Sequence, residues 1–374
     1  MTTDTLGLYI HIPFCVRKCN YCDFASFGGA SDELRQRYIA RLKEEILSYS
    51  ERTSLTVDSI FFGGGTPSLL TAGELEDILL SVRDAFKISD DCELTLEANP
   101  GTVDFKKLSD YASLGVNRLS IGLQSIRENE LKILGRIHSY SDFLSAYDAA
   151  SKAGIDNINV DLMYAIPEQT PQSFQKTLEA MISLSPSHLS AYGLILEEGT
   201  PFFKRRGELT FPTEDEECEM YRLATDMLRT AGYSHYEISN YAREGKRSRH
   251  NLKYWRGQSY VGVGLAAHSY LDKNRYFNTE DISEYLSPDY AKYVKGEAVG
   301  PLDEAYEYAM MRLRLDEGIS LSDYKGRFDR DFLSGKEEMI KKYVGAGLMR
   351  LSRDTLSFTE SGFYVSNSLL TELL

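Results

Sequence analysis

Short apolar runs alternate with amphipathic segments along the first half of the chain. The runs are rich in β-branched residues and nearly continuous, which is typical of strands whose two faces are both covered. The segment from Ser31 repeats Leu34, Tyr38 and Leu42 at helical spacing, and its acidic start favours a helix N-terminus. Regular alternation of such runs and helices predicts a parallel α/β sheet. Six strands are expected, at 6–12, 57–64, 92–98, 116–122, 155–163 and 187–194.

The pattern changes after residue 212. A long amphipathic helix is expected from Thr213, and a basic segment and a Gly-rich run follow it. From Gly300 the pattern is mostly helical with one short hairpin, which is typical of a small winged-helix-like domain. We therefore expect an α/β core at 1–212, a connecting region at 213–299 and a mainly helical domain at 300–374.

Composition and charge narrow the class of protein. Hydrophobic residues make up 42% of the 374 residues and charged residues 26%, as in globular proteins, and the net charge is −14. So acidic a surface repels phosphate backbones, which disfavours nucleic-acid binding. The chain has no apolar run of about 18 residues. Its start lacks the basic and apolar regions of a signal peptide, so we expect a cytoplasmic protein without a transmembrane segment. In that compartment, cysteines are expected to be ligands or buried thiols.

Three of the five cysteines lie close together in FCVRKCNYCDF, residues 14–24. Cys15, Cys19 and Cys22 follow the first expected strand, and thiolates grouped so tightly favour zinc, copper(I) or an iron–sulfur cluster. A structural zinc needs a fourth ligand, for which His11 and Asp23 are the local candidates. A four-iron cluster held by three thiolates instead keeps one iron free for an exchangeable ligand. We favour the cluster, because the missing fourth thiolate then makes a binding site.

Glycines and polar residues follow the later strands. The glycines of FFGGGTPS, after the second strand, let a ligand approach the backbone closely. The polar residues after the third, fourth and fifth strands are Glu97, Gln124 and Asp161. Each of them alone would be expected to cap a strand end. Together, at the carboxyl edge shared by parallel strands, they offer acceptors for a nucleoside and a cation for a carboxylate. These residues are Gly64, Gly65, Thr66, Glu97, Gln124, Arg136 and Asp161, with Tyr9 and Tyr21 as aromatic neighbours.

The spacing C-x₃-C-x₂-C after a first strand resembles the signature of the radical S-adenosylmethionine (SAM) superfamily. The segments YIHIPFC, GGGTP, EANP, RLSIGLQS and DLMYAIPEQT follow in an order similar to that of the anaerobic coproporphyrinogen III oxidase (HemN-like) family. This resemblance implies a partial (β/α)₆ barrel with a mainly helical C-terminal domain. It implies a 4Fe–4S cluster on Cys15, Cys19 and Cys22, whose open iron binds the amino and carboxylate groups of SAM. It also implies SAM contacts at Tyr9, Tyr21, Gly64, Gly65, Thr66, Glu97, Gln124, Arg136 and Asp161.

Two features depart from the oxidase. Phe24 stands where HemN-like oxidases carry a further cysteine, and the first expected strand begins without their long N-terminal extension. Both features are shared with the HemW branch of the family, described as haem chaperones. The resemblance therefore implies a protein that binds a 4Fe–4S cluster, SAM and haem and passes haem to an acceptor protein. The alternatives are a radical SAM oxidoreductase acting on a porphyrinogen and a zinc-stabilised binding module.

The segment RHNLKYW, residues 249–255, resembles the H-N-x-x-Y-W motif of that branch, which is associated with haem and comprises His250, Asn251, Tyr254 and Trp255 here. His250 and Tyr254 share a face of a helical turn, and either is a candidate axial ligand. Tyr254 and Trp255 offer flat apolar area. The competing interpretation makes His250 and Trp255 packing residues beside a solvated basic loop. Both interpretations are compatible with a homodimer, and with a peripheral contact between this protein and a membrane-bound acceptor protein. Six basic residues nearby suit haem propionates, namely Arg243, Lys246, Arg247, Arg249, Lys253 and Arg256.

Overall fold

A sheet of six parallel strands forms the centre of the protein, whose computed structural model describes residues 5–374. All six strands expected from the apolar runs are present, within a few residues of their expected bounds. Each is hydrogen-bonded to the next one along the chain, so the expected parallel α/β core is confirmed. The strands are β1 (Thr5–Ile12), β4 (Thr56–Gly64), β5 (Ile88–Ala98), β6 (Arg118–Gln124), β7 (Asn157–Tyr164) and β8 (His188–Gly193).

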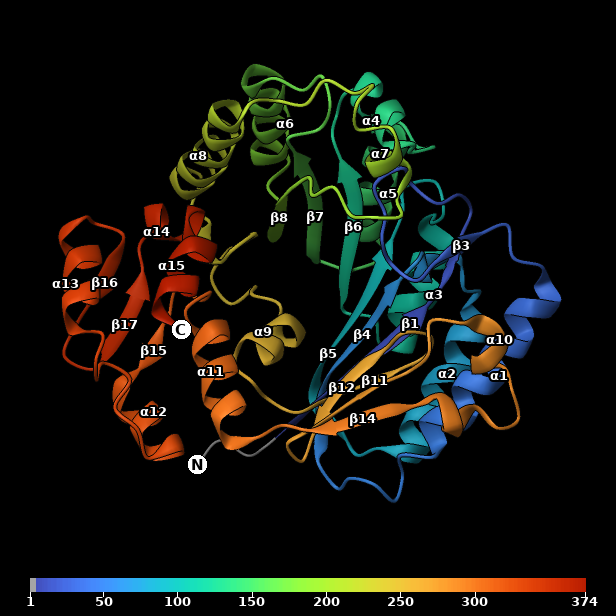
Figure 1. Cartoon of the computed structure of the whole chain (residues 1–374). Coiled ribbons are helices and arrows are strands. Elements are labelled where there is room, and N and C mark those ends of the chain that lie inside the picture. Colours follow the sequence, from blue (N-terminus) through green and yellow to red (C-terminus); the bar gives the residue numbers. More distant parts are fainter. Residues whose placement is uncertain (1–4) are drawn as a thin grey trace.

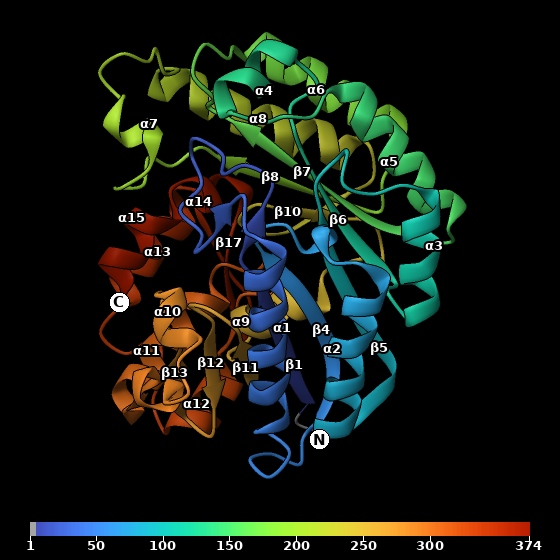
Figure 2. The same ribbon diagram turned by 90° about the vertical axis from the view of Figure 1, so that its right-hand side faces the viewer.

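Helices connect these strands and cover the outer face of the curved sheet (Figure 2). Ser31 caps α1 by accepting a hydrogen bond from the N–H of Leu34, as its position before the acidic turn predicts. Thr71 and Glu74 form a reciprocal capping box at the start of α2. The helices are α1 (Asp32–Leu47), α2 (Ala72–Ala85), α3 (Phe105–Leu114), α4 (Glu128–Leu134), α5 (Tyr140–Lys152) and α6 (Pro171–Leu184).

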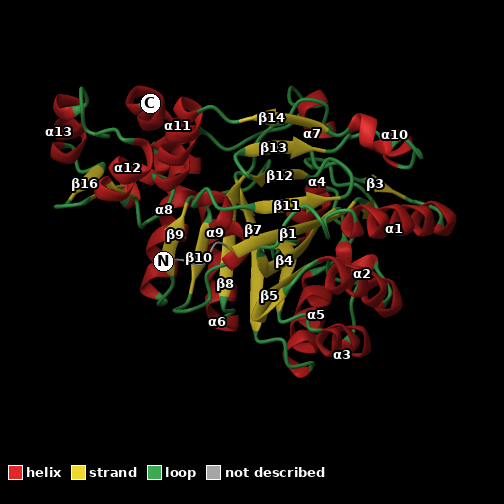
Figure 3. Ribbon diagram, turned by 90° about the horizontal axis from the view of Figure 1, so that it is seen from below, coloured by secondary structure: helices red, strands yellow, loops and turns green. Residues whose placement is uncertain are grey.

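The segment expected as a connecting region, 213–299, instead extends the sheet at both ends. After α7 (Pro201–Lys204) and α8 (Glu214–Thr230), β10 (Asn240–Ala242) pairs with β8 and β9 (Ser234–Glu237) pairs with β10. At the other end β11 pairs in parallel with β1, and an antiparallel meander continues outward from it, as Figure 3 shows. The resulting sheet has 12 strands. Its added elements are β11 (Tyr260–Val263), β12 (His268–Leu271), β13 (Asn274–Phe277) and β14 (Lys295–Ala298), with α9 (Arg249–Trp255) and α10 (Ile282–Tyr285) between strands.

The C-terminal part consists of helices around a small antiparallel sheet of order β15-β17-β16. It lies beside the open side of the curved main sheet, next to α9 (Figure 1). The expected hairpin is present as β16 and β17, and β15 adds a third strand. Its elements are α11 (Pro301–Arg312), β15 (Ile319–Ser320), α12 (Leu321–Phe328), α13 (Glu337–Gly345), β16 (Met349–Leu351), β17 (Thr355–Phe358), α14 (Glu360–Tyr364) and α15 (Ser366–Leu373). Within residues 5–374, no helix combines the length and the apolar character needed to cross a membrane.

A buried carboxylate ties the added meander to the core. Glu45 of α1 is 3% exposed and accepts hydrogen bonds from the Gly264 N–H at 3.0 Å, the Asn278 amide at 2.7 Å and the Tyr285 hydroxyl at 2.7 Å. These three partners lie after β11, after β13 and in α10, so one side chain holds two loops and a short helix against α1. Burial raises the pKa of Glu45, whereas these hydrogen bonds lower it.

Replacing Glu45 by Ala should reduce the free energy of unfolding by about 3 kcal/mol, because three buried donors lose their acceptor together. Urea unfolding followed by circular dichroism measures the loss. Glu44→Ala is the matched control, since the Glu44 side chain is 65% exposed and should change stability by less than about 0.5 kcal/mol. Equal stability of the two variants would show that Glu45 does not hold the meander.

Candidate cofactor pocket

The cysteine loop is framed by two short strands and fixed to the end of a helix. Cys15 ends β2 (Phe14–Cys15), which pairs in parallel with β3 (Phe27–Gly28). Between them, the N–H of Asn20 donates to the carbonyl of Leu134 at 2.9 Å, and its side-chain amide donates to the carbonyl of Ile133 at 2.8 Å. The loop that carries Cys19 and Cys22 is therefore anchored to α4, which is more than 100 residues away in the sequence.

Each of the three cysteine sulfurs lies next to a hydrogen-bonding group from another residue. The Thr66 hydroxyl donates to Cys15 Sγ at 3.5 Å, and the Arg136 guanidinium donates to Cys19 Sγ at 3.6 Å. The Ser26 hydroxyl lies 3.9 Å from Cys22 Sγ. Such neighbours stabilise the charge of a metal-bound thiolate. Burial raises the pKa of the Cys22 thiol, whereas its hydrogen bond with Ser26 lowers that pKa.

The three cysteines open onto a pocket at the carboxyl ends of the strands. The residues predicted from their positions after strands come together in it, with the exception of Tyr9. The pocket also contains three polar groups that the sequence reasoning missed, Arg17, Asn99 and Ser120, although they lie within the quoted segments FCVRKCNYCDF, EANP and RLSIGLQS. Its predicted lining residues are Cys15, Cys19, Cys22, Tyr21, Gly64, Gly65, Thr66, Glu97, Gln124, Arg136 and Asp161.

Close contacts around Gly64 and Gly65 leave no room for a side chain at either position. Gly64 has φ of 112°, and a Cβ at this position would lie 2.5 Å from the His11 ring. A Cβ on Gly65 would lie 2.7 Å from the carbonyl oxygen of Phe14, beside the cysteine loop. The N–H of Gly64 donates to Glu97 at 3.1 Å. Glycine here lets β4 pass directly beneath the cysteine loop.

Two half-buried carboxyl groups give the pocket its electrostatic character. Burial, followed by the nearby charge of Asp161, raises the pKa of Glu97 to about 8. Burial also raises the pKa of Asp161, although the Asn159 amide at 2.7 Å and the Ser120 hydroxyl at 3.2 Å donate to its carboxylate. A ligand with a positive charge would replace the protons of this pair. The pocket therefore favours a cationic ligand beside Glu97 and Asp161.

Arg136 lies on the cysteine side of the same pocket. Besides Cys19 Sγ, its guanidinium donates to the Asn99 side-chain oxygen at 2.7 Å and to the carbonyl of Gly122. A Cβ on Gly122 would lie 2.6 Å from the guanidinium, so glycine is needed to admit it. This arrangement places one fixed positive charge beside the cysteines, in the same pocket as the two carboxyl groups.

Tyr9 contributes to a neighbouring cavity of about 530 Å³ instead. Its hydroxyl lies 3.0 Å from Nδ1 of His11, whose Nε2 lies 2.9 Å from the carbonyl oxygen of Ala25. Phe24 lines both this cavity and the cysteine pocket, and 67% of its surface is exposed. Phe24, at the position where the oxidases have a cysteine, therefore lies between the two hollows.

The H-N-x-x-Y-W motif lies inside the barrel. His250 is 1% exposed, with Nδ1 3.1 Å from the Ser59 hydroxyl and Nε2 2.7 Å from the Tyr254 hydroxyl. Burial lowers its pKa to about 3. Both ring nitrogens are engaged, so axial ligation by His250 would require these contacts to break. The N–H of Asn251 donates to Ser248 at the start of α9, and Trp255 packs against a small buried apolar cluster.

The prediction that the basic residues around this motif are available for propionates is wrong for four of them, because each is paired with an acidic side chain. Arg247 pairs with Asp316 at 2.6 Å, and Arg256 pairs with Glu317. Arg249 pairs with Asp91, and the buried Lys253 pairs with Asp58 at 2.7 Å. The acidic partners lie far away in the sequence, so the local charge count could not reveal them. The basic segment joins α9 to the core and to the C-terminal domain.

A site for one metal ion is a different arrangement from a site for a cluster. Among the residues that the structure describes, no three His, Cys, Asp or Glu side chains converge on a point that could hold one ion. A single zinc ion needs such convergence, whereas the thiolates of a 4Fe–4S cluster bind separate irons. Cys15, Cys19 and Cys22 stay candidates for the second arrangement.

Comparisons with known proteins agree with this geometry. The family model of the radical SAM superfamily matches residues 9–181, and that of the HemN C-terminal domain matches residues 299–365. Heme chaperone HemW of Haemophilus influenzae is 35% identical over 98% of this chain and 97% of its own length. Heme chaperone HemW of Escherichia coli is 36% identical over 98% of this chain and 97% of its own length.

This chain belongs to the HemW family of radical SAM proteins. The solved structure of coproporphyrinogen III oxidase (HemN) from Escherichia coli has the same fold, with a TM-score of 0.85 and 20% identity over 99% of this chain and 90% of that chain. The expected partial (β/α)₆ radical SAM barrel is thereby confirmed.

Radical SAM proteins use a 4Fe–4S cluster and SAM, and the pocket fits both. Three thiolates with neighbouring hydrogen-bonding groups suit the cluster, and the carboxyl pair of Glu97 and Asp161 suits the cationic groups of SAM. Arg136 lines the same pocket and would supply a cation for its carboxylate. The assignment of each side chain to a particular atom of SAM stays a prediction.

Replacing any one of Cys15, Cys19 and Cys22 by Ala should abolish the cluster, because two thiolates do not hold four irons. Iron and acid-labile sulfide are measured after anaerobic reconstitution. Cys218→Ala in α8 is the matched control, since Cys218 does not line the pocket, and it should keep the iron content of the parent. Iron retained at the parent level in a variant lacking all three cysteines would contradict the assignment.

The carboxyl pair should make the apoprotein less stable as the pH rises. Between about pH 4.5, the ordinary pKa of a glutamate, and about pH 8, Glu97 holds a proton in the folded protein that the unfolded chain has lost. The free energy of unfolding should therefore fall with pH in this window, by at most about 1.4 kcal/mol per pH unit for one group. Urea unfolding at a series of pH values should show a smaller slope for Glu97→Gln. An unchanged slope would mean that Glu97 is ionised in the folded apoprotein.

Proposed function

We propose that this protein is a haem chaperone, which binds a 4Fe–4S cluster, SAM and haem and passes the haem to an acceptor protein. The observation that carries the proposal is the match over nearly the full chain to relatives named heme chaperone HemW, at 31–36% identity. Phe24 supports it, because an apolar side chain occupies the position of the further cysteine of the oxidases. We place the protein in the cytoplasm, where thiols stay reduced and available to metals.

Within this proposal the chain's own residues have distinct tasks. Cys15, Cys19 and Cys22 hold the cluster, and Thr66 and Arg136 donate hydrogen bonds to two of their sulfurs. The remaining pocket residues orient SAM at the open iron. The cluster supplies an electron to SAM when both are bound. The haem would be cargo, bound in a different place from the cluster.

A second candidate function, oxidation of a porphyrinogen, is favoured by one observation. The cavity of about 530 Å³ adjoins the cluster pocket at Phe24, so a substrate bound there would lie near SAM. Tyr9 and Glu280 line that cavity, and the acidic side chain does not suit the carboxylates of a coproporphyrinogen. The chaperone therefore remains the function that the site supports best.

Reconstituted protein should bind ferric haem, deliver it to an apoprotein of higher haem affinity, and leave coproporphyrinogen III unchanged under anaerobic, reducing conditions with SAM. Haem binding should also persist without Cys15, Cys19 and Cys22, because the aromatic residues of α9 that suit a porphyrin do not line the cysteine pocket. Optical titration measures binding, and chromatography of the tetrapyrroles measures turnover. Free haem at the same concentration is the control for transfer. Conversion of coproporphyrinogen III would favour the oxidoreductase, and absence of haem binding would contradict the chaperone.

A further inference from the structure

A row of hydrogen-bonded side chains crosses the interior of the barrel from the cofactor pocket to the start of α9. It consists of Asp161 and Asn159 on β7, His188 on β8 and Tyr236 on β9, and it ends at Ser248. Asn159 lies opposite His188 in the register of β7 and β8, and Asn159 and Asp161, two residues apart, share one face of β7. Asn159, His188 and Tyr236 are buried. We call these side chains the polar row.

Asn159 fixes the carboxylate of Asp161. Its amide nitrogen donates to Asp161 Oδ1 at 2.7 Å and to the Ser120 hydroxyl at 2.8 Å, and that hydroxyl donates to Asp161 Oδ2 at 3.2 Å. Its amide oxygen accepts from His188 Nδ1 at 2.6 Å and from the Ser190 hydroxyl at 3.2 Å. All four hydrogen-bonding positions of the amide are used, which leaves it one orientation. Both carboxylate oxygens of Asp161 are therefore held.

His188 connects this amide to Tyr236. Because an amide oxygen only accepts, the ring proton of His188 lies on Nδ1, and the unprotonated Nε2 accepts from the Tyr236 hydroxyl at 2.8 Å. Burial, followed by the charge of Arg118, holds the pKa of His188 well below its usual range. The ring is therefore neutral, and its two partners fix its tautomer.

The far end of the polar row is fixed by α9 and by the C-terminal domain. The Tyr236 hydroxyl accepts from the N–H of Ser248 at 3.3 Å, and Ser248 is the residue that caps α9. The Tyr236 carbonyl accepts from the N–H of Asp316 at 3.0 Å, and the Arg247 guanidinium lies 5.2 Å from the Tyr236 ring. The hydrogen bonds therefore run in one direction, from the cap of α9 to the Asp161 carboxylate.

A carboxylate that is already held binds a cationic ligand better than a mobile one, because ordering a side chain on binding costs free energy. The inner members of the row, Asn159, His188 and Tyr236, do not line the cofactor pocket, whereas Asp161 and Ser120 do. Any effect of the inner members on a ligand in the pocket must therefore pass through the side chains that they hold.

From these contacts we propose that Asn159, His188 and Tyr236 are positioning residues for SAM, which hold the Asp161 carboxylate in place from the start of α9. This inference rests on the proposed binding of SAM in the cofactor pocket and adds the residues behind that site. Because α9 carries the H-N-x-x-Y-W motif, a displacement of this helix would lower SAM affinity. Bound SAM would favour the present position of α9 to the same extent.

The test is an anaerobic calorimetric titration of the cluster-reconstituted full-length protein with SAM. Asn159→Ala should lower SAM affinity by about tenfold or more, because the carboxylate loses a donor directly. His188→Leu and Tyr236→Phe should lower it by about threefold or more, because they act through Asn159. His188→Asn keeps an N–H group beside Asn159 and should restore most of the affinity lost in His188→Leu. Iron content and thermal unfolding establish that each variant is folded and holds the cluster.

A double variant separates positioning from a merely structural role. In the Asn159→Ala background the row is already interrupted, so adding Tyr236→Phe should change SAM affinity by less than about twofold. An additional loss as large as that of Tyr236→Phe alone would mean that Tyr236 does not act through Asn159, and would overturn the inference.

Matched controls come from the same region. Tyr233→Phe removes the hydroxyl of a neighbouring buried tyrosine, which donates to the carbonyl of Pro186 outside the row. His235→Leu changes the residue before Tyr236 on β9, whose ring packs against Tyr241 and Phe363 instead. Both should bind SAM as the parent does. If the parent binds SAM but the row variants match these controls, the inference is wrong. If the parent binds no SAM, the cofactor assignment itself is wrong, and the inference falls with it.

Discussion

The insertion of α9 into the half-open barrel is the constraint on which the rest of the structure depends. The carboxylate of Glu93 on β5 accepts hydrogen bonds from the N–H groups of Arg249 at 3.0 Å and His250 at 3.2 Å. Lys253 donates to Thr5 on β1 and pairs with Asp58 on β4. Without α9 these groups would be buried near the amino ends of the strands without partners, which is costly. The short helix α9 therefore fixes the positions of β1, β4 and β5 relative to one another. The carboxyl ends of these strands lie beside the cysteine loop.

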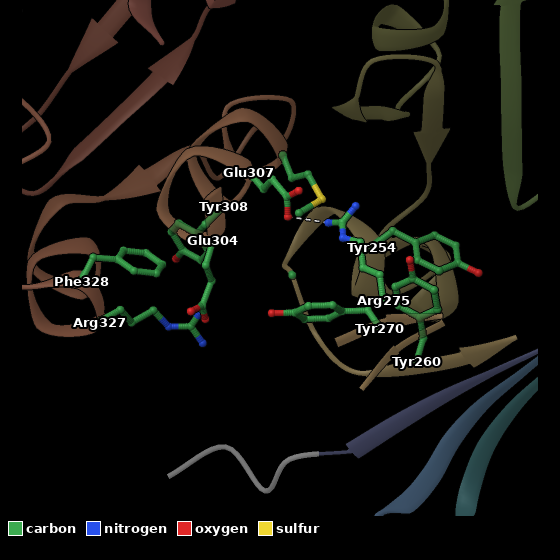
Figure 4. Close-up of a pocket in the computed structure, with 11 residues that line it drawn as sticks. Tyr254, Tyr260, Tyr270, Arg275, Glu304, Glu307, Tyr308, Arg327 and Phe328 are labelled. Atoms are coloured by element: carbon green, nitrogen blue, oxygen red, sulfur yellow. Dashed lines mark hydrogen bonds and ion pairs between the residues drawn. The ribbon is translucent and has the colours of Figure 1, made fainter. Parts of the chain in front are cut away.

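The same helix connects the hollows of the molecule. Tyr254 lines both the cavity of about 530 Å³ and a cleft between the barrel and the C-terminal domain (Figure 4), and Phe24 lines both that cavity and the cluster pocket. The three hollows therefore follow one another from the C-terminal domain to the cysteines. The middle cavity, whose walls include Tyr9 and His11, separates the other two.

The sequence predicted those parts that local patterns encode. The six parallel strands and the cysteine pocket followed from apolar runs and from residues placed just after them. Strands β9–β14 were missed because each has only three or four residues and is defined by pairing with distant segments. The expected free cations of the basic segment were wrong because partners such as Asp58 and Asp316 lie far away in the sequence. The cleft between α9 and the C-terminal domain had no signal in the sequence, since packing of two distant segments creates it.

The pairing of β1 with β11 has a consequence for synthesis of the chain on the ribosome. β1 (Thr5–Ile12) pairs with β4 soon after it emerges, but its other edge waits for β11 (Tyr260–Val263), and α9 immediately precedes β11. At ordinary translation rates the intervening residues take roughly 10–50 s. During this time the nascent chain exposes an unpaired apolar strand edge, which invites association with other chains. The residues that complete the sheet arrive late, so the growing protein depends on protection of its first strand until α9 and β11 are in place.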